Sequence, residues 1–127
     1  AFAADAVVTT GRHAAAESGA LAKAASGALD QIRWIEVQNL ARALEEIGTL
    51  GFTRVGLDSD ADTEIEAAIT GERIALVLGA EGKGLRRLTR ETCDVVARLS
   101  MPGPIASLNV SNAAALALYL ASRHLAR

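Results

Sequence analysis

An unbroken apolar stretch, Ile74-Ala75-Leu76-Val77-Leu78, runs directly into a glycine-rich segment and narrows the folds open to this chain. A strand with no polar side chain has no face suited to water, which is typical of a strand covered on both faces in a parallel sheet. Glycines at positions 79, 82 and 84 then mark the turn out of the strand. We therefore expect residues 73–78 to form the centre of a parallel α/β sheet.

Strand and helix patterns alternate along the remainder of the chain. Asn39 is a suitable N-cap for a helix that would end at Gly48 or Gly51. This alternation predicts a mostly parallel sheet that binds ligands at the carboxyl ends of its strands, so function should lie in the loops after Leu78 and Leu99. The expected strands are residues 6–9, 34–37, 52–57, 73–78 and 95–99, and the expected helices are residues 14–29, 40–47, 85–91 and 110–124.

The composition excludes several classes of protein. The 127 residues are 50% hydrophobic and 22% charged, a balance typical of one soluble globular domain. A net charge of −2 gives no basic surface for general nucleic-acid binding, so any RNA site must be local or supplied by another domain. The single cysteine, Cys93, excludes an intramolecular disulfide and favours a reducing, cytoplasmic compartment. The longest strictly apolar run, residues 113–121, is far below the roughly 18–20 residues of a membrane span.

The glycine-rich segment, residues 79–84, fits neither common nucleotide motif. A Walker A loop needs Gly-Lys-Ser/Thr at its end, but Gly84 is followed by Leu85, and a dinucleotide fingerprint needs a third glycine where Arg87 stands. Its place between a strand and a helix still favours an anionic or electron-rich ligand, because main-chain N–H groups and the helix dipole meet there. A plain glycine-rich turn is the alternative, and a nucleotide-phosphate binder ranks last because both motifs fail.

Three other patterns point to structure more than to chemistry. Residues 58–62 resemble a calcium loop but carry Thr63 at the required glycine and Ile69 at the required glutamate, so we interpret them as an acidic surface loop. His13 and His124 have no partners at ligand spacing, and no metal is implied. In the loop from residue 99 to 111, polar side chains either cap the last helix or orient a substrate hydroxyl, and taken alone capping is favoured. These side chains are Ser107 and Asn109.

Together, residues 78–89 (LGAEGKGLRRLT) and 99–119 (LSMPGPIASLNVSNAAALALY) resemble the second and third signature motifs of the SpoU-type (TrmH) branch of the SPOUT RNA methyltransferases. The resemblance covers essentially the whole chain and is strongest to bacterial 23S rRNA guanosine 2′-O-methyltransferases. It implies a parallel sheet whose C-terminal part forms a deep trefoil knot, an exception to the usual absence of knots. It also implies methyl transfer from S-adenosylmethionine to a ribose 2′-hydroxyl of ribosomal RNA, with guanosine the expected nucleotide and transfer RNA the alternative substrate.

The resemblance also implies roles for individual residues, with no metal required. The reacting hydroxyl would be positioned, and the active-site loop ordered, by Glu81, Ser107 and Asn109. The cofactor would be held largely through main-chain groups at Gly79, Leu99, Met101, Gly103 and Leu108. RNA phosphates would be met by Lys83, Arg86 and Arg87. This chain has Leu-Ser-Met where the family usually has Ile-Pro-Met, a change that a pocket built from main-chain groups should tolerate.

The ends of the chain carry two further expectations. The family's first motif, with an Asn and an Arg at the reacting hydroxyl, would lie upstream of Ala1, and Arg12 stands beyond it. We therefore expect residues 1–127 to be a catalytic domain truncated at its N-terminus, without the first motif or any N-terminal RNA-binding domain. A noncatalytic module that binds cofactor and dimerises is the alternative for such a fragment. The last helix is apolar almost all round, which indicates a homodimer interface along it.

Overall fold

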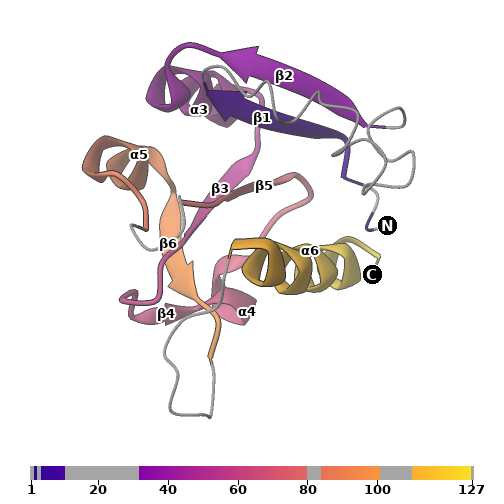
Figure 1. Ribbon diagram of the computed structural model, residues 1–127. Coiled ribbons are helices and arrows are strands. Elements are labelled where there is room, and N and C mark those ends of the chain that lie inside the picture. The colour runs from indigo at the N-terminus through magenta and orange to yellow at the C-terminus, as the bar shows by residue number, and fades with distance from the viewer. Residues whose placement is uncertain (1, 3, 11–31, 80–83, 101–109, 127) are drawn as a thin grey trace.

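The computed structural model describes residues 2, 4–10, 32–79, 84–100 and 110–126, which form a mixed α/β fold with parallel sheets. A two-stranded parallel sheet pairs β1 (Ala6–Thr10) with β2 (Arg33–Val37). A four-stranded parallel sheet has the order β4-β6-β3-β5, with β3 at Thr53–Leu57, β4 at Thr63–Glu64, β5 at Ile74–Val77 and β6 at Val95–Arg98 (Figure 1).

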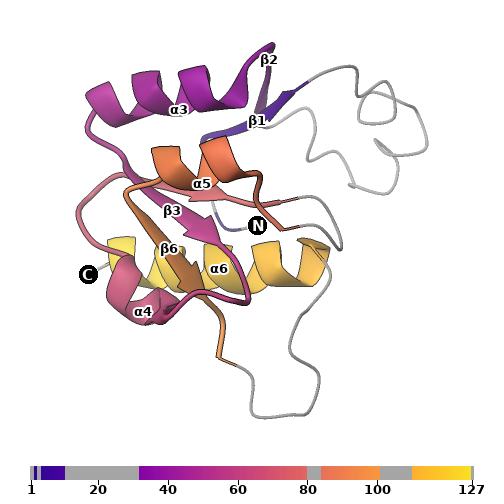
Figure 2. The ribbon, with the colours of Figure 1, turned by 90° about the vertical axis from the view of Figure 1, so that its left-hand side faces the viewer.

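In the described ranges four helices accompany these strands: α3 (Leu40–Thr49), α4 (Ile65–Ala68), α5 (Arg87–Thr92) and α6 (Val110–Leu125). In Figure 2, α6 runs along one side of β3 and β6, whereas α5 lies on the other side with α3 beyond it. None of the helices in the described part of the chain is both long enough and apolar enough to cross a membrane.

Most of the expected elements are confirmed within a residue or two of their ends. Asn39 caps α3 as predicted, because its side-chain oxygen accepts a hydrogen bond from the backbone N–H of Arg42 at 3.0 Å. The helix stops before Gly51, whose φ of +90° suits glycine at this turn. The expected helix at 14–29 lies outside the described residues. The short elements β4 and α4 were not predicted, because two and four residues are too few to show a period.

The prediction that residues 73–78 form the centre of the sheet is wrong. Among the described strands β5 lies at an edge and pairs only with β3, whereas β3 and β6 are the strands with neighbours on both sides. A continuous apolar sequence indicates that both faces of a strand are covered, but it does not indicate how many strands pair with it. In β5, Ile74, Ala75 and Leu76 are only half-buried, whereas Val55, Gly56 and Leu57 of β3 are buried.

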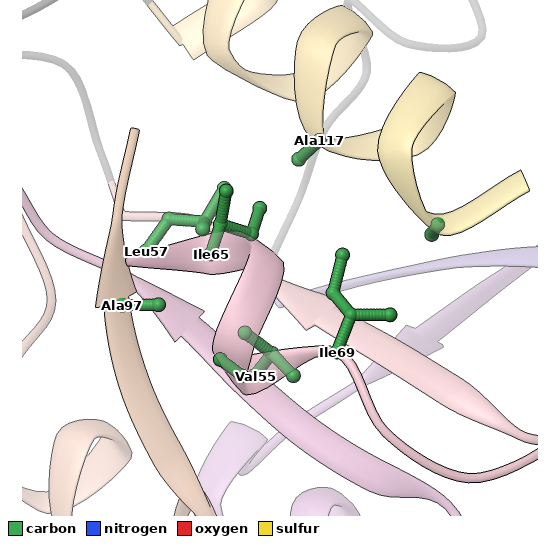
Figure 3. Packing of buried hydrophobic residues seen from close by; sticks show 8 residues of the cluster. Val55, Leu57, Ile65, Ile69, Ala97 and Ala117 are labelled. Carbon is green, nitrogen blue, oxygen red and sulfur yellow. The ribbon is translucent and has the colours of Figure 1, made fainter. Parts of the chain in front are cut away.

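The main core lies between the four-stranded sheet and the helices α4 and α6. Val55 and Ile65 are completely buried there, and Ala117 of α6 packs toward them (Figure 3). Small residues at 117 and 121 let the helix approach the sheet closely, and Leu120 packs against the same core. This packing fixes the carboxyl edge of β3 and β6 relative to the start of α6.

Candidate active site

Three adjacent parallel strands end at one edge of the four-stranded sheet. Because β3 lies between β5 and β6 in parallel register, the residues after these strands come together at the carboxyl edge. They include Asp58 after β3, Gly79 after β5 and Leu99 after β6. Open parallel sheets bind their ligands at this edge. The loops that follow Leu78 and Leu99 therefore start at the same edge of the sheet, on either side of Asp58.

The ends of the glycine-rich segment meet at this edge. A Cβ atom on Gly79 would overlap the main-chain carbonyl of Gly84 and would lie 2.8 Å from the backbone nitrogen of Leu85. Gly84 has a φ of +65°, a left-handed conformation that favours glycine. The main-chain path therefore requires both glycines. Gly79 and Gly84, the first and last residues of the glycine-rich segment, lie next to each other.

The carboxylate of Asp58 connects the end of β3 with α5. One oxygen, Oδ1, accepts a hydrogen bond from the backbone N–H of Asp60 at 2.9 Å. The other, Oδ2, accepts one from Nη1 of Arg90 at 2.5 Å, in an ion pair whose aspartate side chain is only 14% exposed. The prediction that residues 58–62 form an acidic surface loop is wrong for Asp58, because its carboxylate is hydrogen-bonded and largely covered.

The start of the second loop is also held by a carboxylate. Glu64 of β4 accepts a hydrogen bond from the hydroxyl of Ser100 and lies 3.8 Å from the guanidinium of Arg98. Leu99, between these two residues, is half-buried against the core. The chain is thus anchored on the sheet immediately before residues 101–109.

The structure brings some of the predicted site residues together and leaves others undescribed. Gly79 and Leu99 lie at the carboxyl edge as predicted, and Arg86 and Arg87 are exposed at the start of α5. Arg87 pairs with Glu91 one turn later at 3.2 Å, an arrangement that keeps it on the surface. The predicted residues outside the described ranges are Glu81, Lys83, Met101, Gly103, Ser107, Leu108 and Asn109.

Sequence reasoning missed Asp58, Glu64 and Arg90 as residues that shape this edge. The usable signal was the position of Asp58 directly after a buried strand, where a parallel sheet places its functional loops. Nothing local marks Arg90, because its partner lies 32 residues away in sequence.

At the opposite end of β3, a second ion pair joins the same parts of the fold. Nε and Nη2 of Arg54 donate to the two carboxylate oxygens of Asp94 at 3.0 and 2.8 Å, and the backbone N–H of Arg54 donates at 2.7 Å. These hydrogen bonds lower the pKa of Asp94 below its ordinary value. Burial raises the pKa of the neighbouring Cys93 thiol, which donates to the carbonyl of Thr89 at 3.3 Å and so stays protonated at neutral pH.

The sequence matches one family of proteins. The model of the SpoU rRNA Methylase family matches residues 1–119. The chain belongs to this family. Among curated SpoU-type relatives, the 23S rRNA (guanosine-2′-O-)-methyltransferase RlmB of Burkholderia sp is 44% identical over 120 residues, which are 94% of this chain and 49% of that protein. The protein of the same name from Xylella fastidiosa (strain 9a5c) is 50% identical over 101 residues, 80% of this chain and 41% of that protein. The chain thus spans less than half the length of these relatives.

Solved SpoU-type structures share the fold. A crystal structure of an RNA 2′-O ribose methyltransferase matches with a TM-score of 0.86 and 27% identity, covering 99% of this chain and 48% of that one. The SpoU methyltransferase AviRb from Streptomyces viridochromogenes, in complex with the cofactor AdoMet, matches with a TM-score of 0.85 and 23% identity over 97% of this chain and 51% of that one. The parallel sheets described above are therefore those of the SpoU fold.

Proposed function

We propose that residues 1–127 form the catalytic domain of an S-adenosylmethionine-dependent methyltransferase that modifies a ribose 2′-hydroxyl, at a guanosine of ribosomal RNA. The observation that carries this proposal is the SpoU family match over residues 1–119, which includes the paired glycines at the carboxyl edge. The names of the curated relatives at 44% and 50% identity support the choice of 23S ribosomal RNA and guanosine.

The residues at the carboxyl edge suit a cofactor held by the main chain. Gly79 and Leu99 carry no charged or hydrogen-bonding side chain, so a ligand beside them would be met by peptide groups. The charged side chains nearby, Asp58 and Arg90, are already paired with each other and do not compete for it. We include Met101, Gly103 and Leu108 in the cofactor pocket and propose that the C-terminal part of the chain forms a trefoil knot around it.

S-adenosylmethionine supplies an electrophilic methyl group on a sulfonium when it is bound. The protein must then hold the ribose oxygen in line with that group and help the hydroxyl lose its proton. We assign Glu81, Ser107 and Asn109 to this positioning. Lys83, Arg86 and Arg87 are proposed to meet RNA phosphates, which is supported for the two arginines by their exposure at the start of α5.

The outer face of α6 supports a homodimer. Leu116 and Tyr119 are 47% and 49% exposed, although the ring of Tyr119 also contacts Phe2 with centroids 6.3 Å apart. Large apolar side chains on one exposed helix face are typical of a surface that a partner covers. We propose that this partner is a second copy of the chain. We also propose that the protein acts on RNA in the cytoplasm.

The first test is calorimetric titration of the folded chain with S-adenosylhomocysteine, with ATP as the control ligand. Saturable binding of the former alone is expected, and a folded chain that binds neither would refute the cofactor proposal. In a methyl-transfer assay on ribosomal RNA, Glu81→Ala and Asn109→Ala should abolish turnover with little change in cofactor affinity. Cofactor binding without any transfer by the unaltered protein would instead favour the noncatalytic module.

A further inference from the structure

Asp58 and Arg90 form an ion pair beside Gly84, the residue that closes the glycine-rich segment. Asp58 directly follows β3, an inner strand of the four-stranded sheet, and its backbone N–H continues the ladder by donating to the carbonyl of Ala97 at 2.9 Å. The main chain of Asp58 is therefore fixed by the sheet. Its side chain is fixed as well, because both carboxylate oxygens accept hydrogen bonds.

Gly84 lies beside this carboxylate. A Cβ atom on Gly84 would come into ordinary contact, at 3.4 Å, with Oδ2 of Asp58, the oxygen that also binds Arg90. The residue that closes the glycine-rich segment thus lies beside an ion pair that joins the end of β3 to α5. Because Gly84 in turn touches Gly79, the end of β5 lies close to the same ion pair.

Leu85 completes the contact on the apolar side. Its Cδ1 atom lies 2.8 Å from the position that a Cβ on Gly56 would take, so Leu85 packs on the bare backbone of β3. The polar anchor at Asp58 and the apolar anchor at Gly56 together hold the chain where it enters α5. Of the two, the polar anchor is the one that lies beside Gly84.

We propose that the Asp58–Arg90 ion pair holds Gly84 beside Gly79 for cofactor binding, by fixing α5 and the residues that lead into it against the end of β3. This inference rests on the proposed function, since it assigns a task to residues around the proposed cofactor site. Neither Asp58 nor Arg90 is a catalytic residue in this scheme. Their role is to hold the two glycines together, so that the main-chain groups at Gly79 keep one position before the ligand arrives.

The fold contains a matched control in the Arg54–Asp94 pair. Both pairs join β3 to the segment that includes α5 and the start of β6, and both have one member that is largely covered. The Arg54–Asp94 pair lies at the amino end of β3, away from the glycine-rich segment. A purely structural role for the two pairs would predict the same effect on cofactor binding, whereas a positioning role predicts an effect of the Asp58–Arg90 pair alone.

The experiment compares S-adenosylhomocysteine binding by the unaltered chain with four variants: Asp58→Asn, Arg90→Gln, the double variant of these two, and Asp94→Asn. All are titrated at a temperature where circular dichroism shows them folded. Asp58→Asn and Arg90→Gln should each weaken binding about tenfold. The affinity of the double variant should be within about twofold of that of the weaker-binding single variant, because the effects of residues that act as one unit are not additive. Asp94→Asn should stay within about twofold of the unaltered chain.

Hydrogen exchange at the amides of Gly84 and Leu85 gives a second readout without cofactor. Asp58→Asn should speed exchange there, and Asp94→Asn should not. If Asp58→Asn fails to fold, Arg90→Gln carries the same comparison, since the Arg90 side chain is 39% exposed and its loss is easier to accommodate.

Three results would overturn the inference: unchanged affinity and exchange in Asp58→Asn, equal losses in Asp58→Asn and Asp94→Asn, or additive losses in the double variant. A different result would refute the proposed function. If the unaltered chain does not bind S-adenosylhomocysteine, the cofactor proposal fails, and hydrogen exchange alone then decides whether Asp58 anchors the segment.

Discussion

Replacing Gly79 with alanine should damage the proposed cofactor site while leaving the sheet folded. The added methyl group would overlap the carbonyl of Gly84 and would lie 2.8 Å from the nitrogen of Leu85, inside the 3.4 Å at which ordinary contact begins. Both neighbours are main-chain atoms, which cannot rotate away as a side chain can. The two ends of the glycine-rich segment must therefore move apart.

The size of the effect follows from the cost of overpacking. An extra methyl group in a filled site costs about 1–3 kcal/mol. If the cofactor must restore the original geometry in order to bind, that cost is subtracted from its binding free energy. At about 1.4 kcal/mol per tenfold change, affinity for S-adenosylhomocysteine should fall about 5- to 140-fold.

Gly51→Ala is the control for the loss of a glycine as such. Gly51 has a φ of +90°, so alanine is strained there, but nothing lies within 4 Å of its added methyl group. The control should lower the free energy of unfolding in urea by about 1 kcal/mol and leave cofactor affinity unchanged. Calorimetric titration of both variants tests the reasoning. Wild-type affinity in Gly79→Ala, or an equal loss in Gly51→Ala, would show that the close approach at Gly79 does not shape the site.

Three further predictions concern the scaffold. Asp94→Asn should lower the free energy of unfolding at neutral pH by about 1 kcal/mol, a figure reduced for the 42% exposure of this side chain. Because Arg54 lowers the Asp94 pKa, this stabilisation is present above the ordinary pKa of 3.8 and is lost as the pH falls through the folded-state pKa. Urea titrations should therefore show the difference in unfolding free energy between Asp94→Asn and the unaltered chain disappear in acid. A difference that persists in acid would contradict the assignment of the stabilisation to the ionised Asp94 carboxylate. Burial raises the Cys93 pKa, so iodoacetamide should modify it much more slowly in the folded protein than in urea, and equal rates would mean that the thiol is open. Ile65→Ala should cost about 2–5 kcal/mol in urea unfolding because Ile65 is 0% exposed, against less than about 0.5 kcal/mol for the half-exposed Leu116→Ala.

Local patterns were enough to predict most of the elements. The β-branched and apolar runs at β1, β2 and β6 and the cap at Asn39 depend on neighbours within a few residues, so a sequence displays them directly. The same holds for the glycine-rich turn after β5, whose place at the carboxyl edge follows from strand order alone. These patterns located both loops of the candidate site.

The position of a strand within the sheet is a different kind of property. β3 reads TRVGL, with a charged residue and a glycine among five, yet it is one of the two inner strands of the four-stranded sheet. Gly56 is needed because Leu85 and Cys93 pass at 2.8 and 3.0 Å from its would-be Cβ, an approach set by α5. Arg54 is accommodated because Asp94 neutralises it. Neither reason is visible within β3, and so sequence alone favours the more apolar β5 as the centre.

The two ion pairs of β3 explain why the site depends on long-range contacts. Arg54 and Asp58 stand four residues apart, as do Arg90 and Asp94, and the two segments run in opposite directions, so that the first residue of each pairs with the last residue of the other. Cys93, between Arg90 and Asp94, packs on Gly56 of β3. The two pairs tie the end of α5 to both ends of β3, over sequence separations of 32 and 40 residues. Loosening the Arg54–Asp94 end should cost stability, whereas loosening the Asp58–Arg90 end should also release Gly84 and the glycine-rich segment beside it.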